Sequence, residues 1–126
     1  MKHLRRFNES VDDLETEIMD ALLFLKDDGF SIEVKKEDGK YHIVRIKKDD
    51  NSIFNLNQIA SDVSALISLA TEDLNQEISY MYILKENEKG QNEREFIRGS
   101  DIDTIQLKDL SVDIKVFRIE FKDKTI

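Results

Sequence analysis

One pattern occurs twice in this chain: an amphipathic helix followed by a β-hairpin. Apolar residues recur at helical spacing over residues 10–28 and again over 55–73. After each run, two alternating segments flank a turn that contains glycine, which predicts hairpins over 30–48 and 78–98. A further alternating segment follows at 112–121. The order is αββαβββ, and we expect an α+β fold with two helices packed on a largely antiparallel sheet of about five strands.

Particular residues predict where the first elements begin and end. Ser10 with Asp13 resembles a capping box at the start of the first helix, and Gly29 is suited to end it. Asp38-Gly39 lies between two alternating segments, which is a strong indication of a hairpin. The register stays open, because a two-residue primed turn and a type I turn with a bulge at Gly39 pair different residues.

The last alternating segment changes parity part-way along its length. A bulge near Val116 would explain the change, and so would a central strand covered on both sides. The two apolar sets are Val112, Ile114 and Val116 on one face, and Phe117, Ile119 and Phe121 on the other.

The apolar positions of the two predicted helices match at a constant offset of 45 positions, and each helix is followed by a hairpin. They are compatible with an internal αββ repeat over 10–48 and 55–98, and also with two amphipathic helices that share a phase by chance. A length of 126 residues fits a single domain, 1–126, and residues 1–9 then form an N-terminal lead-in segment.

No residue pattern points to catalysis or to a bound cofactor. The sequence has no Cys, which excludes thiolate nucleophiles and thiolate zinc sites. Its two histidines, His3 and His42, have no partner at ligand spacing, and we expect both on the surface. Phosphate-binding glycine loops, nucleophile elbows, zinc-protease motifs and EF-hand loops are also missing. We therefore expect a non-enzymatic protein with no catalytic residues, no metal site and no cofactor.

Charge is distributed unevenly along a chain whose formal net charge is -8. The segment 9–28 holds eight acidic residues against Lys26 alone, whereas 35–48 holds six basic residues, so the molecule should be electrically two-faced. An acidic helix face can attract a basic partner or imitate a phosphate backbone, and it can equally be a solvated face that favours the helix dipole. The candidate interaction residues on this helix are Asp12, Asp13, Glu17 and Asp20.

The second helix differs in its nearly neutral outer surface. There is no Lys or Arg between Asn51 and Leu84, and Asp62 is the only charged residue of this helix before Glu72. In a chain with 37% charged residues, this indicates either a helix enclosed within the fold or an outer face that meets another chain. The candidate interaction residues here are Ser61, Ser64, Ala65 and Ser68.

The first ten residues, MKHLRRFNES, are basic in an acidic chain. Lys2, Arg5 and Arg6 can pair with the acidic helix or serve as a docking tag. No apolar core of a secretory signal is present there, and the longest apolar run, Ala21–Leu25, is far shorter than a membrane span. We expect a cytoplasmic protein, with a location in a virion as the alternative.

Three segments, MKHLRRFNES, DLETEIMDALLFLKDDGFSIEV and FNLNQIASDVSALISL, resemble small uncharacterised proteins of large tailed bacteriophages. Such proteins often begin with Met-Lys and continue through an aromatic-polar-Glu step into an acidic helix. Some phage head proteins of this kind carry an N-terminal packaging leader that is cut after a Leu/Ile-x-Glu step. The only such step here is Leu84-Lys85-Glu86, in the second half of the chain, so a cleaved leader is not expected.

The sequence thus favours three roles. The first is a phage-type accessory protein that binds another protein, of phage or host, or that self-associates through the second helix. The second is an acidic nucleic-acid mimic that inhibits a host nucleic-acid-binding enzyme, and the third is a minor virion component. Direct nucleic-acid binding is not expected, because the net charge repels phosphate and the basic segment 35–48 has no aromatic stacking residue apart from Tyr41. Membrane binding is not expected either.

Overall fold

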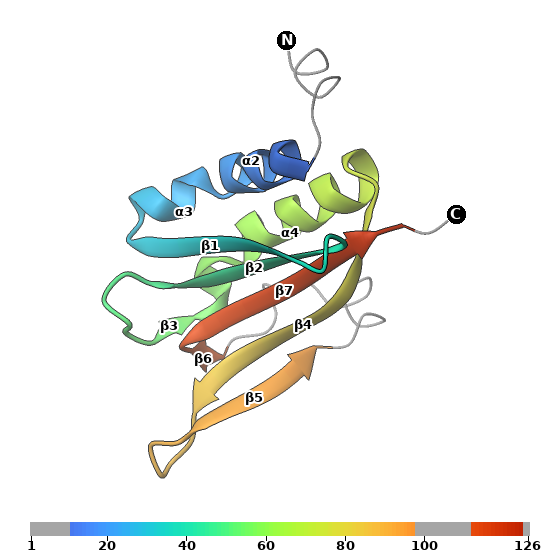
Figure 1. Cartoon of the computed structure of the whole chain (residues 1–126). Coiled ribbons are helices and arrows are strands. Elements are labelled where there is room, and N and C mark those ends of the chain that lie inside the picture. The colour runs from blue at the N-terminus through green and yellow to red at the C-terminus, as the bar shows by residue number, and fades with distance from the viewer. Residues whose placement is uncertain (1–10, 98–111, 125–126) are drawn as a thin grey trace.

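The structure, a computed structural model, describes the backbone of residues 11–97 and 112–124 and the side chains of 14–96 and 112–124. In this part of the chain, helices pack on one face of a five-stranded antiparallel sheet, as the sequence predicts (Figure 1). The lead-in segment 1–9, His3 and most of the stretch between the last two predicted strands lie outside the described residues.

The first predicted helix is two helical segments, α2 (Val11–Ala21) and α3 (Leu23–Asp27). They meet at Leu22, where the Leu22 N–H donates to the Met19 carbonyl oxygen at 3.2 Å and the Leu25 N–H donates to the Leu22 oxygen at 3.0 Å. These are tight turns of the 3₁₀ type, so the axis is interrupted without a loop. Gly29 ends the helix with a φ of 90°, a left-handed conformation that glycine adopts without strain.

The first hairpin consists of β1 (Phe30–Glu37) and β2 (Tyr41–Lys48). Glu37 pairs with Tyr41, and both Asp38 and Gly39 have positive φ. The Lys40 N–H donates to the Glu37 carbonyl oxygen at 3.2 Å. Positive φ at both central positions is the hallmark of a primed turn. The connection has three residues, so the pairing of Glu37 with Tyr41 differs from that of both alternatives that the sequence left open.

The second predicted helix is built in three parts after a short strand, β3 (Phe54–Asn55). Asn55 and Gln58 form a capping box at the 3₁₀ turn Leu56–Gln58. The helix continues as α4 (Ala60–Ser68) and finishes in a π-helical turn, Leu69–Asp73.

Four more strands follow: β4 (Gln76–Glu86), β5 (Asn92–Ile97), β6 (Asp113–Ile114) and β7 (Val116–Asp123). The main sheet has the order β1-β2-β7-β4-β5, and β3 pairs with β6 in a small second sheet. The parity change of the last segment arises because the chain bends at Lys115 and β7 is the central strand. The register shift of this sheet lies in β4, between Ile78 and Tyr80, and not near Val116.

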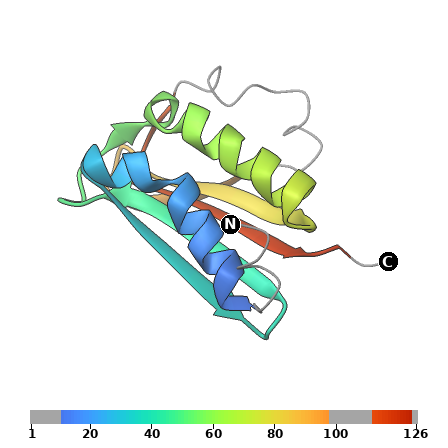
Figure 2. The same cartoon turned by 90° about the horizontal axis from the view of Figure 1, so that it is seen from above.

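The hydrophobic core lies between the sheet and the helices, which all cover the same face (Figure 2). Phe117, Ile119 and Phe121 of β7 are fully buried beneath them, together with Ile18 of α2 and Leu66 of α4. The helix-hairpin order does occur twice. However, β2 is the second strand of its hairpin and β4 the first of its own, so the two hairpins join β7 through different strands. The internal repeat stays a prediction.

Candidate functional site

The face of the sheet opposite the helices is not covered by any described element, and we call it the open face. Because side chains alternate along each strand, the pairing register determines which residues share this face. One row crosses all five strands and is rich in arginine and aromatic side chains. Its members, in strand order, are Glu33, Arg45, Arg118, Tyr82 and Phe96.

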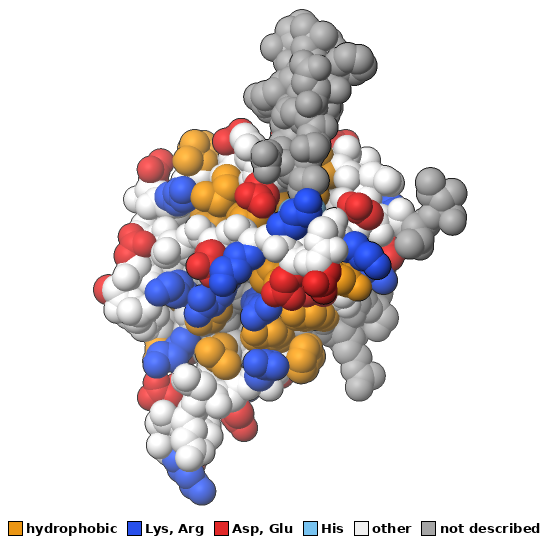
Figure 3. Space-filling model, viewed as in Figure 1, with side chains coloured by type: hydrophobic (Ala, Val, Ile, Leu, Met, Phe, Trp, Pro, Cys, Tyr) orange, Lys and Arg blue, Asp and Glu red, His pale blue; other side chains and the backbone are white. Residues whose placement is uncertain are grey.

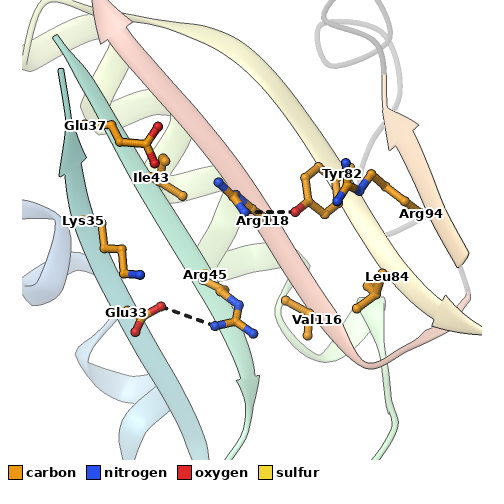
Figure 4. A pocket seen from close by; sticks show the side chains of 10 residues that line it. All are labelled: Glu33, Lys35, Glu37, Ile43, Arg45, Tyr82, Leu84, Arg94, Val116 and Arg118. Atoms are coloured by element: carbon orange, nitrogen blue, oxygen red, sulfur yellow. Dashed lines mark hydrogen bonds and ion pairs between the residues drawn. The ribbon is translucent and has the colours of Figure 1, made fainter. Parts of the chain in front are cut away.

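A hollow of about 330 Å³ lies along this row, and we call it the cationic hollow (Figure 4). Ile43 and Val116, which are buried, form an apolar floor together with the half-buried Leu84. Charged side chains surround the floor, and Figure 3 shows basic side chains gathered around hydrophobic ones over the middle of the sheet. The lining residues are Glu33, Lys35, Glu37, Ile43, Arg45, Tyr82, Leu84, Arg94, Val116 and Arg118.

The cationic hollow carries positive charge in a negatively charged protein. Four basic and two acidic side chains line it, a balance of +2 against -8 for the chain. Arg45 pairs with Glu33 at 3.4 Å. Within the described part of the protein, Lys35, Arg94 and Arg118 form no ion pair, so their charges are available to a partner.

Aromatic rings hold two of these arginines in place. The Arg118 Nη1 donates to the Tyr82 hydroxyl oxygen at 3.1 Å, and the Arg94 guanidinium lies 4.7 Å from the centre of the Tyr82 ring. Tyr80 stacks on Tyr82 with ring centres 5.9 Å apart, and Phe96 meets both rings edge-on. Such contacts restrict the arginine rotamers before a partner arrives, which lowers the entropy lost on binding.

Tyr80 and the arginines of the open face keep their protons around neutral pH. Partial burial raises the pKa of Tyr80 most strongly, the positive charge of Arg118 opposes this shift, and the Glu120 carboxylate, which accepts a hydrogen bond from Tyr80, adds to it. Arginine keeps its proton at any pH that the protein would meet. The face therefore offers fixed positive charge to a partner.

The outer face of α4 is exposed, so the helix is not enclosed within the described fold. Ser61, Ser64, Ala65 and Ser68 are all exposed, whereas Val63 and Leu66 pack inward. Of the two explanations for the neutral outer surface of this helix, enclosure within the fold therefore does not apply to the described part of the chain. The four residues belong to α4 in the helix layer (Figure 2), whereas the residues that line the cationic hollow lie on the opposite face of the sheet.

The acidic residues predicted on the first helix are not all on its outer face. Asp20 is exposed, but Glu17 has only 4% of its surface exposed. Glu17 is buried because it lies on the inward stripe between Leu14 and Ala21, three and four residues away. The side chains of Asp12 and Asp13 lie outside the described residues.

The expectation that His42 lies on the surface is wrong. His42 is 2% exposed and faces the helices from β2, because its position shares the parity of Val44 and Ile46. Neither ring nitrogen has a hydrogen-bond partner in the described part of the chain. Burial is the main cause that lowers the pKa of His42, so the ring is held neutral inside the core.

Sequence reasoning missed the arginines and aromatic residues of the open face. Tyr82, Arg94 and Phe96 come from the β4–β5 hairpin, whereas Arg118 comes from β7, about 20 positions further along the chain. A partial indication was available, since Arg118 lies between two apolar residues, Phe117 and Ile119, in the last alternating segment. Only the register shows that Arg118 lies opposite Tyr82 on one side and Arg45 on the other.

Two searches within the described residues were negative. No group of three or more His, Asp or Glu side chains is placed to hold a metal ion, and no helix has the length and apolar character to cross a membrane. Comparison with known proteins gave no match to a family model, to a curated protein or to a solved structure.

Proposed function

We propose that this protein acts by binding an acidic protein partner, not by catalysis, and that the cationic hollow is the binding site. One observation carries the proposal: on the open face of an acidic protein, the apolar floor of the hollow is lined by Lys35, Arg94 and Arg118, none of which has an ion pair within the described residues.

The composition of the hollow supports a protein partner. Arginine and tyrosine are enriched at the energetic centres of protein interfaces, where an apolar floor is shielded by a polar rim. Arg94, Arg118 and Tyr82 provide that combination around Leu84 and Val116. Phe96, 58% exposed beside them, extends the apolar contact towards the sheet edge.

The surfaces proposed from the helices remain further candidates. Asp20, Asp27 and Asp28 are exposed on α2, α3 and the residue that follows, which supports an acidic surface that could bind a basic partner or act as a nucleic-acid mimic. The exposed row on α4 supports a second docking face. A phage-type accessory role or a minor virion component rests on the N-terminal resemblance and is proposed on that ground alone.

A peptide titration tests the site. The probe is a fluorescent peptide of alternating Glu and Leu with one central Phe, and its affinity is measured by anisotropy at low and moderate salt. Arg118→Glu reverses one charge in the hollow, and we expect it to weaken binding at least about tenfold, or about 1.4 kcal/mol. Lys89→Glu, in the exposed β4–β5 turn, changes the net charge equally and should have less than about a threefold effect.

Two results would contradict the proposal. Equal weakening by both variants would mean that only net charge matters. Binding of a single-stranded oligonucleotide in preference to the peptide, lost in Arg118→Glu, would assign the hollow to nucleic acid instead.

A further inference from the structure

We infer that the partner of the cationic hollow is a second copy of this chain, which inserts Phe24 of its α3 helix into the hollow. This inference rests on the proposed function, since it takes the hollow to be a docking site for an acidic protein surface. The two surfaces involved are the outer faces of α2 and α3 and the open face of the sheet. No contact within the described residues covers either surface.

The helix surface has the shape and polarity that the hollow requires. Phe24 is 74% exposed and its neighbour Leu23 is 52% exposed, an unusual position for two large apolar side chains on a surface helix. In the described residues, Ile53 and Phe96 are the other large hydrophobic side chains exposed to this degree. Phe24 and Leu23 therefore form an apolar projection that water solvates poorly.

Acidic side chains surround this projection. Asp27 and Asp28 follow Phe24 by three and four residues, which places them on the same side of the helix, and Asp20 precedes it by four across the break at Leu22. All three are exposed. With Lys26 included, three acidic groups and one basic group leave a balance of -2, opposite in sign and equal in size to that of the hollow.

The hollow complements these features one by one. Its apolar floor of Ile43, Leu84 and Val116 can receive a phenyl ring, and a volume of about 330 Å³ leaves room for it. The guanidinium groups of Arg94 and Arg118 at the rim are free to pair with carboxylates. Arginine binds carboxylates in a two-pronged geometry, so the charges would also orient the incoming helix.

The contact has to be made between molecules. The helices lie on one face of the sheet (Figures 1 and 2), and the residues that line the hollow lie on the other face, so no copy can place its own Phe24 in its own hollow. Two copies would join head to tail, with the helix layer of one covering the bare sheet face of the next. One copy contributes its Phe24 projection to the interface and the other contributes its hollow. Each pair therefore leaves one projection exposed and one hollow unfilled.

Sedimentation and light scattering of the full chain test this inference. At about 20 mM salt, we expect the mean mass of the wild type to rise above that of the monomer as the concentration increases, and to fall again at about 0.5 M salt, where the charges are screened. Phe24→Ser removes the projection and Arg118→Glu reverses a charge in the hollow. Each variant alone should lose self-association by at least about tenfold in affinity. Ile53→Ser, at another exposed apolar residue, is the matched control and should associate like the wild type.

Mixing the two variants gives the decisive result. Phe24→Ser still has a hollow and Arg118→Glu still has a projection, so an equimolar mixture should form a one-to-one dimer that grows no further. A two-fold symmetric contact would give no such rescue. Circular dichroism of each variant checks that it is folded, since both substitutions lie at side chains that are not fully buried.

The inference is overturned if the wild type is monomeric at every concentration and salt, if either variant alone still associates, or if the mixture forms no dimer. These outcomes are separate from a failure of the proposed function. A monomeric protein whose binding of the acidic peptide still depends on Arg118 would retain the hollow as a docking site and assign it to a different protein.

Discussion

Replacing His42 with leucine should make this protein more stable, although histidine is the natural residue there. His42 is buried and neither ring nitrogen has a hydrogen-bond partner in the described part of the chain. Each buried polar group left without a partner costs about 1 to 3 kcal/mol. Leucine is of similar size and has no polar atom, and it would lie beside Phe121, its pairing partner on β7.

The size of the stability gain follows from the two ring nitrogens of His42. At the low end of about 1 kcal/mol for each nitrogen, His42→Leu gains about 2 kcal/mol in the free energy of unfolding. An unfolding entropy of about 2.1 cal/mol/K per residue then implies a rise in Tm of roughly 8 °C for a chain of 126 residues.

The gain should also depend on pH. Burial lowers the pKa of His42 most strongly and Lys36 acts in the same direction, while Asp123 and Glu15 oppose them. The folded pKa therefore lies below the unfolded value of 6.5, and the unfolded chain takes up the proton first as the pH falls. Above pH 6.5, protonation of His42 does not lower the free energy of unfolding of the wild type. Below pH 6.5 that free energy falls progressively, whereas leucine at this position adds no such dependence.

Urea unfolding of both proteins between about pH 8 and pH 5 measures this difference. Carboxylate titration affects both proteins alike, so the difference between them isolates His42. The reasoning is refuted if His42→Leu is less stable than the wild type at pH 8, or if the gain does not increase as the pH falls from 7 to 5.

Three further predictions concern the core, the first turn and the β4–β7 pairing. Phe117→Ala removes a fully buried ring from the central strand and should cost about 3 to 5 kcal/mol in urea unfolding, whereas Leu23→Ala, at an exposed position, should cost less than about 0.5 kcal/mol. Gly39→Ala should lower the free energy of unfolding by about 1 kcal/mol, because Gly39 has a φ of 70°. Open space surrounds this position, so only backbone strain is added. Gly39→Asn should cost less, because asparagine tolerates the left-handed conformation better than alanine. Gln76→Leu removes a side chain whose Nε2 donates to Asp123 at 2.6 Å, and faster amide hydrogen exchange at the first residues of β4 should report the loss.

Local sequence patterns predicted the element order because each pattern has a local physical cause. The apolar spacing from Leu14 to Leu25 reflects one buried helix stripe, and Asp38-Gly39 provides the positive φ values of the hairpin turn. Gly29 ends the helix for the same conformational reason. The break at Leu22 was not predicted, since the apolar spacing continues through it and no proline or glycine marks it.

The candidate site was much less accessible from sequence. Prediction concentrated on the exposed faces of the helices, where Ser61, Ser64, Ala65, Ser68 and Asp20 are indeed exposed and Glu17 is not. The cationic hollow depends on strand register, and a shift of one residue would turn Arg118 towards the core. The place of His42 in the core has the same origin, because a polar residue at one position of a strand gives no indication of which face is buried.

The amino-acid sequence by itself determined the helices, the hairpins, the α+β class and the acidic character of the chain, because helix periodicity, turn conformation and charge act over a few residues. The tertiary structure alone decided that β7 lies between β2 and β4, and this placement brings Arg45, Arg118 and Tyr82 into one row. Those residues are separated by tens of positions, so their proximity reflects the packing of strands beneath a shared helix layer and not any local preference.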